Sequence, residues 1–199
     1  MTPKDKVTPR IIGTSFDGTG FVLALASMAD DDAVLAFRLR NRQFLAPFEP
    51  LRDDGYYTLD GVTRHLAQQT QMMAESRSVN WLIWDKDCHQ VIGVINFSNI
   101  IPIPFNACYL GYSLDGAYQG RGVMNAALNL AIDEMFTKVG LHRIMANYLP
   151  DNHKSAKVLA RLGFVKEGYA KAYLQIAGRW QDHVLTALTN DAVLAIPTQ

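Results

Sequence analysis

The sequence predicts a single mixed α/β domain, because strand-like and helix-like segments alternate along nearly its whole length. The chain has 199 residues, of which 49% are hydrophobic and 19% are charged, as is ordinary for a globular protein with a substantial core. The predicted elements follow the order β-α-α-β-β-β-α-β-α-β-β, and we find no repeat. We expect one domain over residues 1–199, with a core at about residues 21–188 and polar tails on both sides.

The N-terminal half is predicted to hold two helices between a first strand and a hairpin. An apolar run at residues 21–25 is typical of a buried strand. The three aspartates at residues 30–32 supply N-caps and suit the positive end of a helix at residues 33–45. An irregular connection follows at residues 46–57, and a second helix at residues 60–76. A hairpin comes next, with strands at residues 81–84 and 91–95. A connection of that length is usually functional or mobile.

The C-terminal half centres on a long amphipathic helix at residues 121–139. Its apolar positions recur every three or four residues and form one stripe, made of Met124, Leu128, Ile132, Met135 and Val139. Gly140 is a typical helix stop. The other predicted elements are strands at 107–114 and 142–148, a short helix at 152–162, and a closing hairpin with strands at 172–176 and 183–188.

The turn that opens the long helix has the sequence Gln119-Gly120-Arg121-Gly122-Val123-Met124. Two glycines let the backbone approach a ligand closely, and the free N–H groups and dipole of the first helical turn favour an anion there. The turn is not a P-loop, because no Gly-Lys-Ser/Thr follows, and it lacks the third glycine of a dinucleotide-binding fingerprint. We therefore weigh a phosphate-binding loop against a plain tight turn.

Composition excludes several classes of function. The net charge of zero argues against a broad nucleic-acid surface, although not against a local patch. The two cysteines make neither a metal motif nor a disulfide framework, and we expect Cys108 to be a buried free thiol and Cys88 to be exposed. Because the N-terminus lacks a secretory apolar core and no apolar run reaches membrane-spanning length, the expected compartment is the cytoplasm.

Three motifs, taken together in their order and spacing, resemble the GNAT superfamily of N-acetyltransferases: Gln119-x-x-Gly122, Asn152-x-x-Ser155 and Leu159-x-x-Leu162-Gly163-Phe164. The resemblance extends over residues 21–188. It implies acetyl-CoA as co-substrate, no metal, and a mixed, mostly antiparallel sheet that splays between its fourth and fifth strands, with helices on both faces. More narrowly, residues 109–113, 142–148, 159–164 and 182–185 resemble the bacterial ribosomal-protein-alanine N-acetyltransferases, which acetylate the N-terminal alanine of a small-subunit ribosomal protein.

The resemblance also implies where coenzyme A binds. The loop at residues 119–124 would hold the pyrophosphate, and the strand at residues 110–114 would pair with the pantetheine arm. A backbone N–H near Tyr112 or Ser113 would polarise the acetyl carbonyl. The implied cofactor-binding residues are Leu110, Gly111, Tyr112, Ser113, Leu114, Gln119, Gly120, Arg121, Gly122, Val123, Met124, Asn152 and Ser155. The superfamily often has Gly or Ala where this chain has Met124, which bears on how tightly the loop closes.

Asn152 and Ser155 are the catalytic residues that the resemblance implies. Asn152 would hydrogen-bond the pantetheine arm, and Ser155, one helical turn later, could protonate the departing thiolate. The alternative is structural, in which Asn152 or Asp151 caps the short helix and Ser155 is a solvated serine of its first turn.

A general base is harder to assign. Asn147 stands near the place where some relatives that acetylate protein N-termini carry a glutamate. Asp182, Glu167 and His153 are alternatives, although the sequence favours a cap or solvated role over a catalytic one for each. An α-amine has a pKa of about 7.7–8.0 against about 10.4 for lysine, so a lysine acetyltransferase must supply roughly 3.4 kcal/mol more of deprotonation. The lack of a strong base therefore favours an N-terminal α-amine as acceptor. Cys108 is disfavoured as a nucleophile, because it lies in a predicted strand and has no paired histidine.

We expect the acceptor to be recognised where a long loop, prolines and exposed aromatic residues coincide, at residues 46–57, 99–106 and 178–180. Aromatic side chains of the first segment would either line a narrow mouth for a small first residue or simply pack the loop onto the body: Phe48, Tyr56 and Tyr57. Glu49 could pair with a protonated amine or a basic substrate residue. Trp180 with Asp182 follows a pattern common among relatives but can equally serve hairpin packing.

Three functions fit the sequence. The first is an acetyl-CoA-dependent N-acetyltransferase of a ribosomal protein N-terminus, acting by direct attack of the amine, with no direct need for nucleic acid or membrane. The second is the same enzyme activity with a polyamine, an aminoglycoside or another small amine as acceptor. The zero net charge is weak evidence against a polycationic substrate. The third is a non-catalytic acyl-CoA-binding module in ribosome assembly, which the intact Asn152-x-x-Ser155 motif disfavours.

Overall fold

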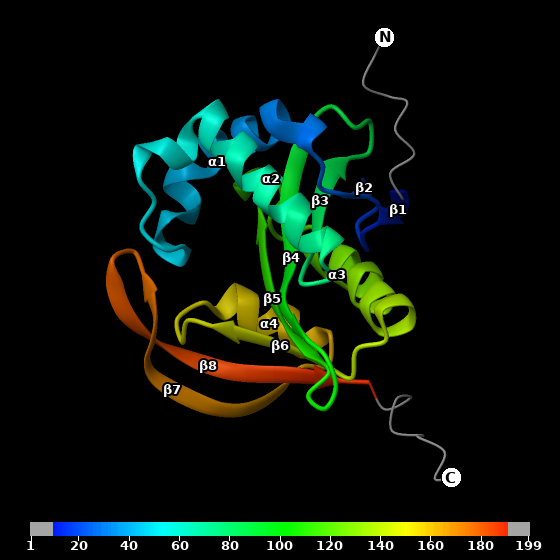
Figure 1. Cartoon of the computed structure of the whole chain (residues 1–199), viewed down its shortest axis with the longest axis vertical. Helices are drawn as coiled ribbons and strands as arrows, with labels where there is room; N and C mark the ends of the chain where they lie inside the picture. The colour runs from blue at the N-terminus through cyan, green and yellow to red at the C-terminus, as the bar shows by residue number, and fades with distance from the viewer. Residues whose placement is uncertain (1–9, 191–199) are drawn as a thin grey trace.

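The computed structural model describes residues 10–190, which form one eight-stranded sheet covered by helices (Figure 1). The spatial order of the strands is β1-β2-β3-β4-β5-β6-β8-β7. All neighbouring strands are antiparallel except β5 and β6, which are parallel. The strands are β1 (Arg10–Thr14), β2 (Gly20–Leu25), β3 (Val79–Asp85), β4 (Val91–Ile101), β5 (Ala107–Leu114), β6 (Arg143–Tyr148), β7 (Val165–Ile176) and β8 (Arg179–Thr189). The predicted fold class, a mixed and mostly antiparallel sheet, is confirmed.

Four α-helices lie between these strands along the chain: α1 (Asp31–Leu45), α2 (Leu59–Ala74), α3 (Val123–Glu134) and α4 (His153–Arg161). Successive side chains of a strand point to opposite faces of the sheet, so one strand can feed two cores. In β3, Ile83 packs in the cluster that contains α3, whereas its neighbour Leu82 packs in the cluster that contains α1 and α2. The helices therefore cover both faces, as expected. None of the helices in residues 10–190 is long and apolar enough to cross a membrane.

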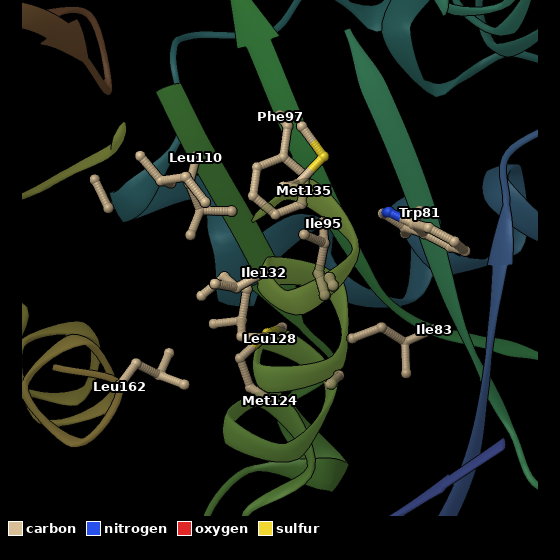
Figure 2. Close-up of a cluster of buried hydrophobic side chains, with 14 of the residues drawn as sticks. Trp81, Ile83, Ile95, Phe97, Leu110, Met124, Leu128, Ile132, Met135 and Leu162 are labelled. Carbon is tan, nitrogen blue, oxygen red and sulfur yellow. The ribbon is translucent and has the colours of Figure 1, made fainter. Parts of the chain in front are cut away.

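The larger core lies between α3 and the middle of the sheet (Figure 2). The predicted apolar stripe of the long helix faces Ile83, Ile95, Phe97 and Leu110 through its first four members, Met124, Leu128, Ile132 and Met135. Val139 departs from the prediction, since it is 45% exposed. The reason is that residues Met135–Val139 form a π-helical turn, whose wider winding changes the phase of the stripe before Gly140 ends the helix with a φ of 77°.

The sheet opens between β5 and β6. These strands pair only through Ala107 with Arg143, Cys108 with Ile144 and Tyr109 with Met145, and they separate beyond that point (Figure 1). Beyond Tyr109, β5 is paired only with β4 on its other side, and beyond Met145, β6 is paired only with β8. This is the predicted splay. It was expected between the fourth and fifth strands and lies between the fifth and sixth, because the structure has an extra strand, β1, at its N-terminal edge.

That extra strand, β1, corrects the expectation of a polar tail up to residue 20. Residues Arg10–Thr14 pair with β2 through a turn in which the Asp17 carboxylate accepts hydrogen bonds from the Ser15 hydroxyl and the Thr19 backbone N–H. The strand was missed because it is short and lies at an edge, where only one strand neighbour is needed. The closing hairpin is also longer than predicted, since β7 begins at Val165 and β8 at Arg179. The rest of both predicted tails lies outside the described residues.

Candidate active site

The glycine loop has the geometry of an anion cradle. Gly120 and Gly122 both have a φ of 77°, in the left-handed region that favours glycine, and Gly122 is the N-cap of α3. Because the first bond of the helix runs from the Ala126 N–H to the Gly122 carbonyl, the N–H groups of Val123, Met124 and Asn125 have no acceptor within the helix. These groups and the helix dipole suit a pyrophosphate.

The surroundings of the loop also fit a phosphate group. No atom lies within 4 Å of the place where a Cβ would stand on Gly120, so the loop is open there, whereas a Cβ on Gly122 would lie 2.1 Å from the ring of Phe16. The side chain of Met124 is 6% exposed and packs into the α3 core, so its bulk points away from the loop. The Gln119 side chain donates a hydrogen bond to the Leu114 carbonyl (3.2 Å), which ties the loop to the end of β5.

The turn between β5 and the loop is fastened to α1 by Asp115, a residue that sequence reasoning did not single out. Its buried carboxylate accepts hydrogen bonds from Arg40 Nε (2.5 Å), Asn41 Nδ2 (3.1 Å) and the Ala117 N–H (2.9 Å). Burial by itself raises the pKa of Asp115, but these hydrogen bonds outweigh it and hold the pKa below its usual value. Asp115 thus connects the phosphate side of the sheet to the helices on the other face.

Asn152 and Ser155 lie at the start of α4, the helix that follows the open edge of β6. The Asn152 side-chain oxygen accepts a hydrogen bond from the Ser155 N–H (3.1 Å), so the capping interpretation holds for that oxygen. The Ser155 hydroxyl is not merely solvated, because it lies 2.7 Å from the Tyr112 hydroxyl. The structure thus brings the predicted Ser155 against the predicted strand of the splay.

The hydroxyl of Tyr112 is a feature that sequence reasoning missed, since it had assigned only a backbone role to this position. Burial raises the pKa of Tyr112 to about 12, and the hydrogen bond to Ser155 opposes the shift. Tyr112 therefore keeps its proton at neutral pH and can donate it to the Ser155 oxygen. The signal available in the sequence was strand alternation, which places Tyr112 on the same face of β5 as Leu110 and Leu114.

The carboxylates and the imidazole proposed as alternatives for the base are occupied elsewhere or exposed. Asp182 accepts hydrogen bonds from the Ala172 N–H and the Tyr169 hydroxyl (both 2.8 Å), which lower its pKa and make it a poorer base. Glu167 forms an ion pair with Arg143, and His153 is exposed at the first position of α4. Asn147 donates to the Tyr173 hydroxyl (3.3 Å) and accepts from the Thr186 N–H (3.4 Å).

The cysteines behave nearly as expected. Cys108 is fully buried in β5, and burial raises its pKa to about 12, which keeps the thiol protonated and unreactive. Cys88 lies in the β3–β4 turn with a φ of 57°, and it is half-buried rather than exposed. Residues 10–190 hold no group of three or more His, Cys, Asp or Glu side chains that could bind a metal ion.

A cavity of about 60 Å³ lies on the face of the sheet that α1 and α2 cover. Its walls combine apolar and polar side chains, among them Val34, Phe37, Arg38, Glu49, Tyr56, His65, Leu66, Gln69, Leu82, Asn96 and Ser113. Two of the predicted acceptor segments meet beside it, because the Glu49 carbonyl accepts a hydrogen bond from the Ala177 N–H (2.9 Å) at the tip of the β7–β8 hairpin (Figure 1). The third, residues 99–106, joins β4 to β5 at the closed end of the splay and does not reach the cavity.

Aromatic side chains pack the loop at residues 46–57 onto the body. The guanidinium groups of Arg38 (3.8 Å) and Arg52 (4.4 Å) both lie over the Tyr56 ring. The guanidinium group of Arg42 lies over the Tyr57 ring (4.2 Å). Phe48 is 44% exposed and does not line the cavity. Packing is thus the main role of Tyr57, while Tyr56 both packs the loop and lines the cavity. Trp180 is 66% exposed beside the hairpin turn.

Comparison with known proteins decides the family. A family model described as an acetyltransferase (GNAT) domain matches residues 23–165. The chain belongs to the GNAT acetyltransferase family. Its relatives include the [Ribosomal protein uS5]-alanine N-acetyltransferase of Escherichia coli (strain K12), which is 48% identical over 149 residues, or 75% of this chain and 77% of that protein. The chain is therefore an N-acetyltransferase by descent.

Solved structures of GNAT enzymes agree with this assignment. The ribosomal-protein-S5-alanine acetyltransferase of Vibrio fischeri superposes with a TM-score of 0.84 at 45% identity, over 89% of this chain and 97% of that one. RimJ of Mycobacterium smegmatis, solved in complex with CoA-disulfide, superposes with a TM-score of 0.86 at 27% identity, over 97% of this chain and 91% of that one. The resemblance seen in the sequence is thus confirmed for both family and fold.

Proposed function

We propose that this GNAT enzyme transfers the acetyl group of acetyl-CoA to the N-terminal α-amine of a ribosomal protein that begins with alanine, in the cytoplasm. The observation that carries the proposal is the 48% identity to the E. coli enzyme named for that reaction, together with a splay and a glycine loop built to hold coenzyme A. No nucleic acid, membrane or metal takes part in it.

On the donor side, the loop at residues 119–124 binds the pyrophosphate through its N–H groups, with Arg121 adding a charge at the rim. The pantetheine arm lies in the splay and pairs with the free backbone edge of β5 at residues 110–114. Asn152 has an amide N–H₂ left for the arm after its oxygen has capped α4. These residues, with Ser155, are the ones that the sequence predicted.

The chemistry is a direct transfer. The amine nitrogen attacks the thioester carbonyl carbon, the new C–N bond forms, and the C–S bond breaks. A backbone N–H of Tyr112 or Ser113 stabilises the charge on the carbonyl oxygen. Ser155 gives its proton to the departing sulfur and recovers one from the Tyr112 hydroxyl, 2.7 Å away. Holding both reactants in one site supplies much of the rate.

The acceptor side disfavours a polyamine. The cavity carries the single carboxylate of Glu49 beside the guanidinium of Arg38, and Arg52 lies against the same Tyr56 ring. A substrate with several ammonium groups would meet more positive than negative charge there, whereas one α-amine needs one carboxylate. A single α-amine is also the acceptor that requires the least deprotonation.

The test is thiol release from acetyl-CoA with two matched peptides. One has a free N-terminal alanine, and the other is blocked at its N-terminus but carries a lysine. We expect release with the free alanine terminus alone. Thiol release with spermidine but with neither peptide would show that the acceptor is a small amine. Binding of acetyl-CoA without thiol release in the presence of any of these amines would indicate a non-catalytic role.

A further inference from the structure

Two neighbouring residues of β5 separate the two reactants. Tyr112 points to the α3 and α4 face, where its hydroxyl meets Ser155, and it packs against the larger core. The next residue, Ser113, lies on the opposite face and lines the cavity together with Glu49. An acceptor that enters through this cavity therefore reaches the splay from the side opposite to the proton donor for the thiolate.

We propose that this cavity holds the first residue of the acceptor, and that Glu49 binds its α-ammonium group and takes up the proton that must leave before attack. The inference rests on the proposed function and deepens it by naming the general base. Sequence reasoning had left Glu49 as one possible charge partner and had looked for the base on other residues.

The backbone of Glu49 is fixed, while its carboxylate is available. Its carbonyl is bound to the Ala177 N–H, which fixes the loop against the β7–β8 hairpin. Within residues 10–190, the Glu49 carboxylate makes neither a hydrogen bond nor an ion pair, and the side chain is half-buried. Arg38, the nearest buried cation on α1, donates to the Tyr56 carbonyl (2.9 Å) and lies over the Tyr56 ring instead. A half-buried carboxylate with no hydrogen bond or ion pair of its own suits a substrate ammonium.

The charges around Glu49 suit a base of moderate strength. The titratable and charged groups around it are Arg38 and Arg42 from α1, His65 from α2, Arg52 from the loop, and Tyr56 and Tyr57 from the turn at Asp54–Tyr57. Burial raises the pKa of Glu49, and Arg52 and Arg38 oppose that shift. Burial lowers the pKa of His65 to about 4, so the imidazole is neutral at neutral pH and is a weaker base than the carboxylate.

The walls of the cavity suit a small first residue. Val34, Phe37, Leu66 and Leu82 provide apolar surface, and Asn96, Gln69 and Ser113 provide polar groups that can bind the first peptide group. The small cavity, of about 60 Å³, favours a small first side chain over a large one. This agrees with alanine as the first residue.

The proton balance closes. The α-ammonium group gives one proton to the Glu49 carboxylate, which frees the nitrogen lone pair for attack on the thioester. As the C–N bond forms and the C–S bond breaks, Ser155 supplies the proton of the new thiol. The second proton of the reacting amine leaves through Glu49 to solvent after the first has been released there. The Ser155–Tyr112 pair regains one proton from solvent, so the reaction releases one proton in total. The products are an amide and a thiol, with no oxidant or further reactant.

The experiment compares Glu49→Gln with wild type in steady-state turnover of the free-alanine peptide. Glutamine keeps the shape and removes the base, so kcat/KM should fall about 100-fold, within the usual contribution of a general base. The rate that is left should rise about tenfold per pH unit up to the amine pKa of about 8, because only free amine can then react. Affinity for acetyl-CoA should not change. Glu75→Gln, on an exposed residue after α2, is the matched control.

A binding measurement separates failure of this inference from failure of the proposed function. In the presence of coenzyme A, wild type should bind the free-alanine peptide more tightly than its N-acetylated form, and Glu49→Gln should lose that preference. If wild type neither binds nor acetylates the alanine peptide but acetylates another amine, the proposed acceptor fails, and Glu49→Gln is then assayed with that amine. Unchanged turnover and unchanged preference in Glu49→Gln, or a loss in His65→Gln alone, overturns the role of Glu49.

Discussion

The two faces of β5 recognise their ligands by different means. On the α3 and α4 face the groups that suit coenzyme A are mostly backbone N–H groups, supplied by two left-handed glycines, a helix N-terminus and an unpaired strand edge. On the α1 and α2 face the cavity is walled by side chains, among them Arg38, Glu49 and His65. A site made of backbone groups can be predicted from the spacing of glycines in the sequence. A site made of side chains from distant segments is visible only once the fold is known.

Asp115 connects the two faces, and its removal is expected to have the largest effect. Asp115→Asn removes a buried charge that accepts three hydrogen bonds, from Arg40, Asn41 and the Ala117 N–H, so the free energy of unfolding should fall by about 3 kcal/mol in all. Denaturant unfolding measures this. Asp54→Asn, which breaks the exposed pair with Arg42, should change stability by less than about 1 kcal/mol.

The same carboxylate predicts a pH dependence. Because the pKa of Asp115 is lower in the folded chain, its contribution to stability is present above the unfolded value of about 3.9 and is lost as the pH falls through the folded pKa. Wild type should therefore lose stability more steeply in acid than Asp115→Asn does. Equal slopes would mean that folding does not lower the pKa of Asp115.

The next largest effect is expected at Ser155, on the donor face. Ser155→Ala removes the proposed proton donor to the thiolate, so kcat should fall about 100-fold, or roughly 2.7 kcal/mol. Acetyl-CoA affinity should change little, since the helix cap from Asn152 to the backbone N–H is retained. Single-turnover kinetics separates the two quantities.

Tyr112→Phe sharpens this prediction. The single substitution Tyr112→Phe should slow turnover less than Ser155→Ala does, because the Ser155 hydroxyl can still donate its own proton to the thiolate. Combined with Ser155→Ala it should add little, since the two hydroxyls act through one hydrogen bond. Additive losses would show that Tyr112 acts independently of Ser155.

The smallest effect is expected from Gly122→Ala. A side chain at a φ of 77° costs about 1–2 kcal/mol, and here the new Cβ would also press against the Phe16 ring. The loop should distort and the affinity for acetyl-CoA should fall about tenfold, as isothermal calorimetry can measure. Binding of the acceptor peptide should not change. Gly140→Ala is the control, because Gly140 has the same φ and open space around it but ends the helix away from the loop.

Local patterns carried the prediction of the fold. The bounds of β5 and the stop at Gly140 were predicted because an apolar run and a helix-ending glycine depend on neighbouring residues alone. β1 was missed because it is a short strand at the edge of the sheet, and the π-helical turn was missed because no pattern in the sequence marks it. In the candidate site, too, the features that depend on local sequence were predicted, and those that depend on distant contacts were not.

The residues of the donor side followed from a motif with fixed spacing. The hydrogen bond between Tyr112 and Ser155 joins residues 43 apart in the chain, and no pattern within either segment reveals it. The cavity around Glu49 similarly draws on both helices, the loop and β5, so its carboxylate could not be distinguished beforehand from any other half-exposed glutamate.

The most direct test of acceptor choice uses one peptide that offers both kinds of amine. It begins with a free alanine and carries an internal lysine, and mass spectrometry after reaction with acetyl-CoA and the enzyme locates the acetyl group. We expect a single acetyl group on the α-nitrogen of the alanine. An acetyl group on the lysine side chain, with the α-amine left free, would contradict it.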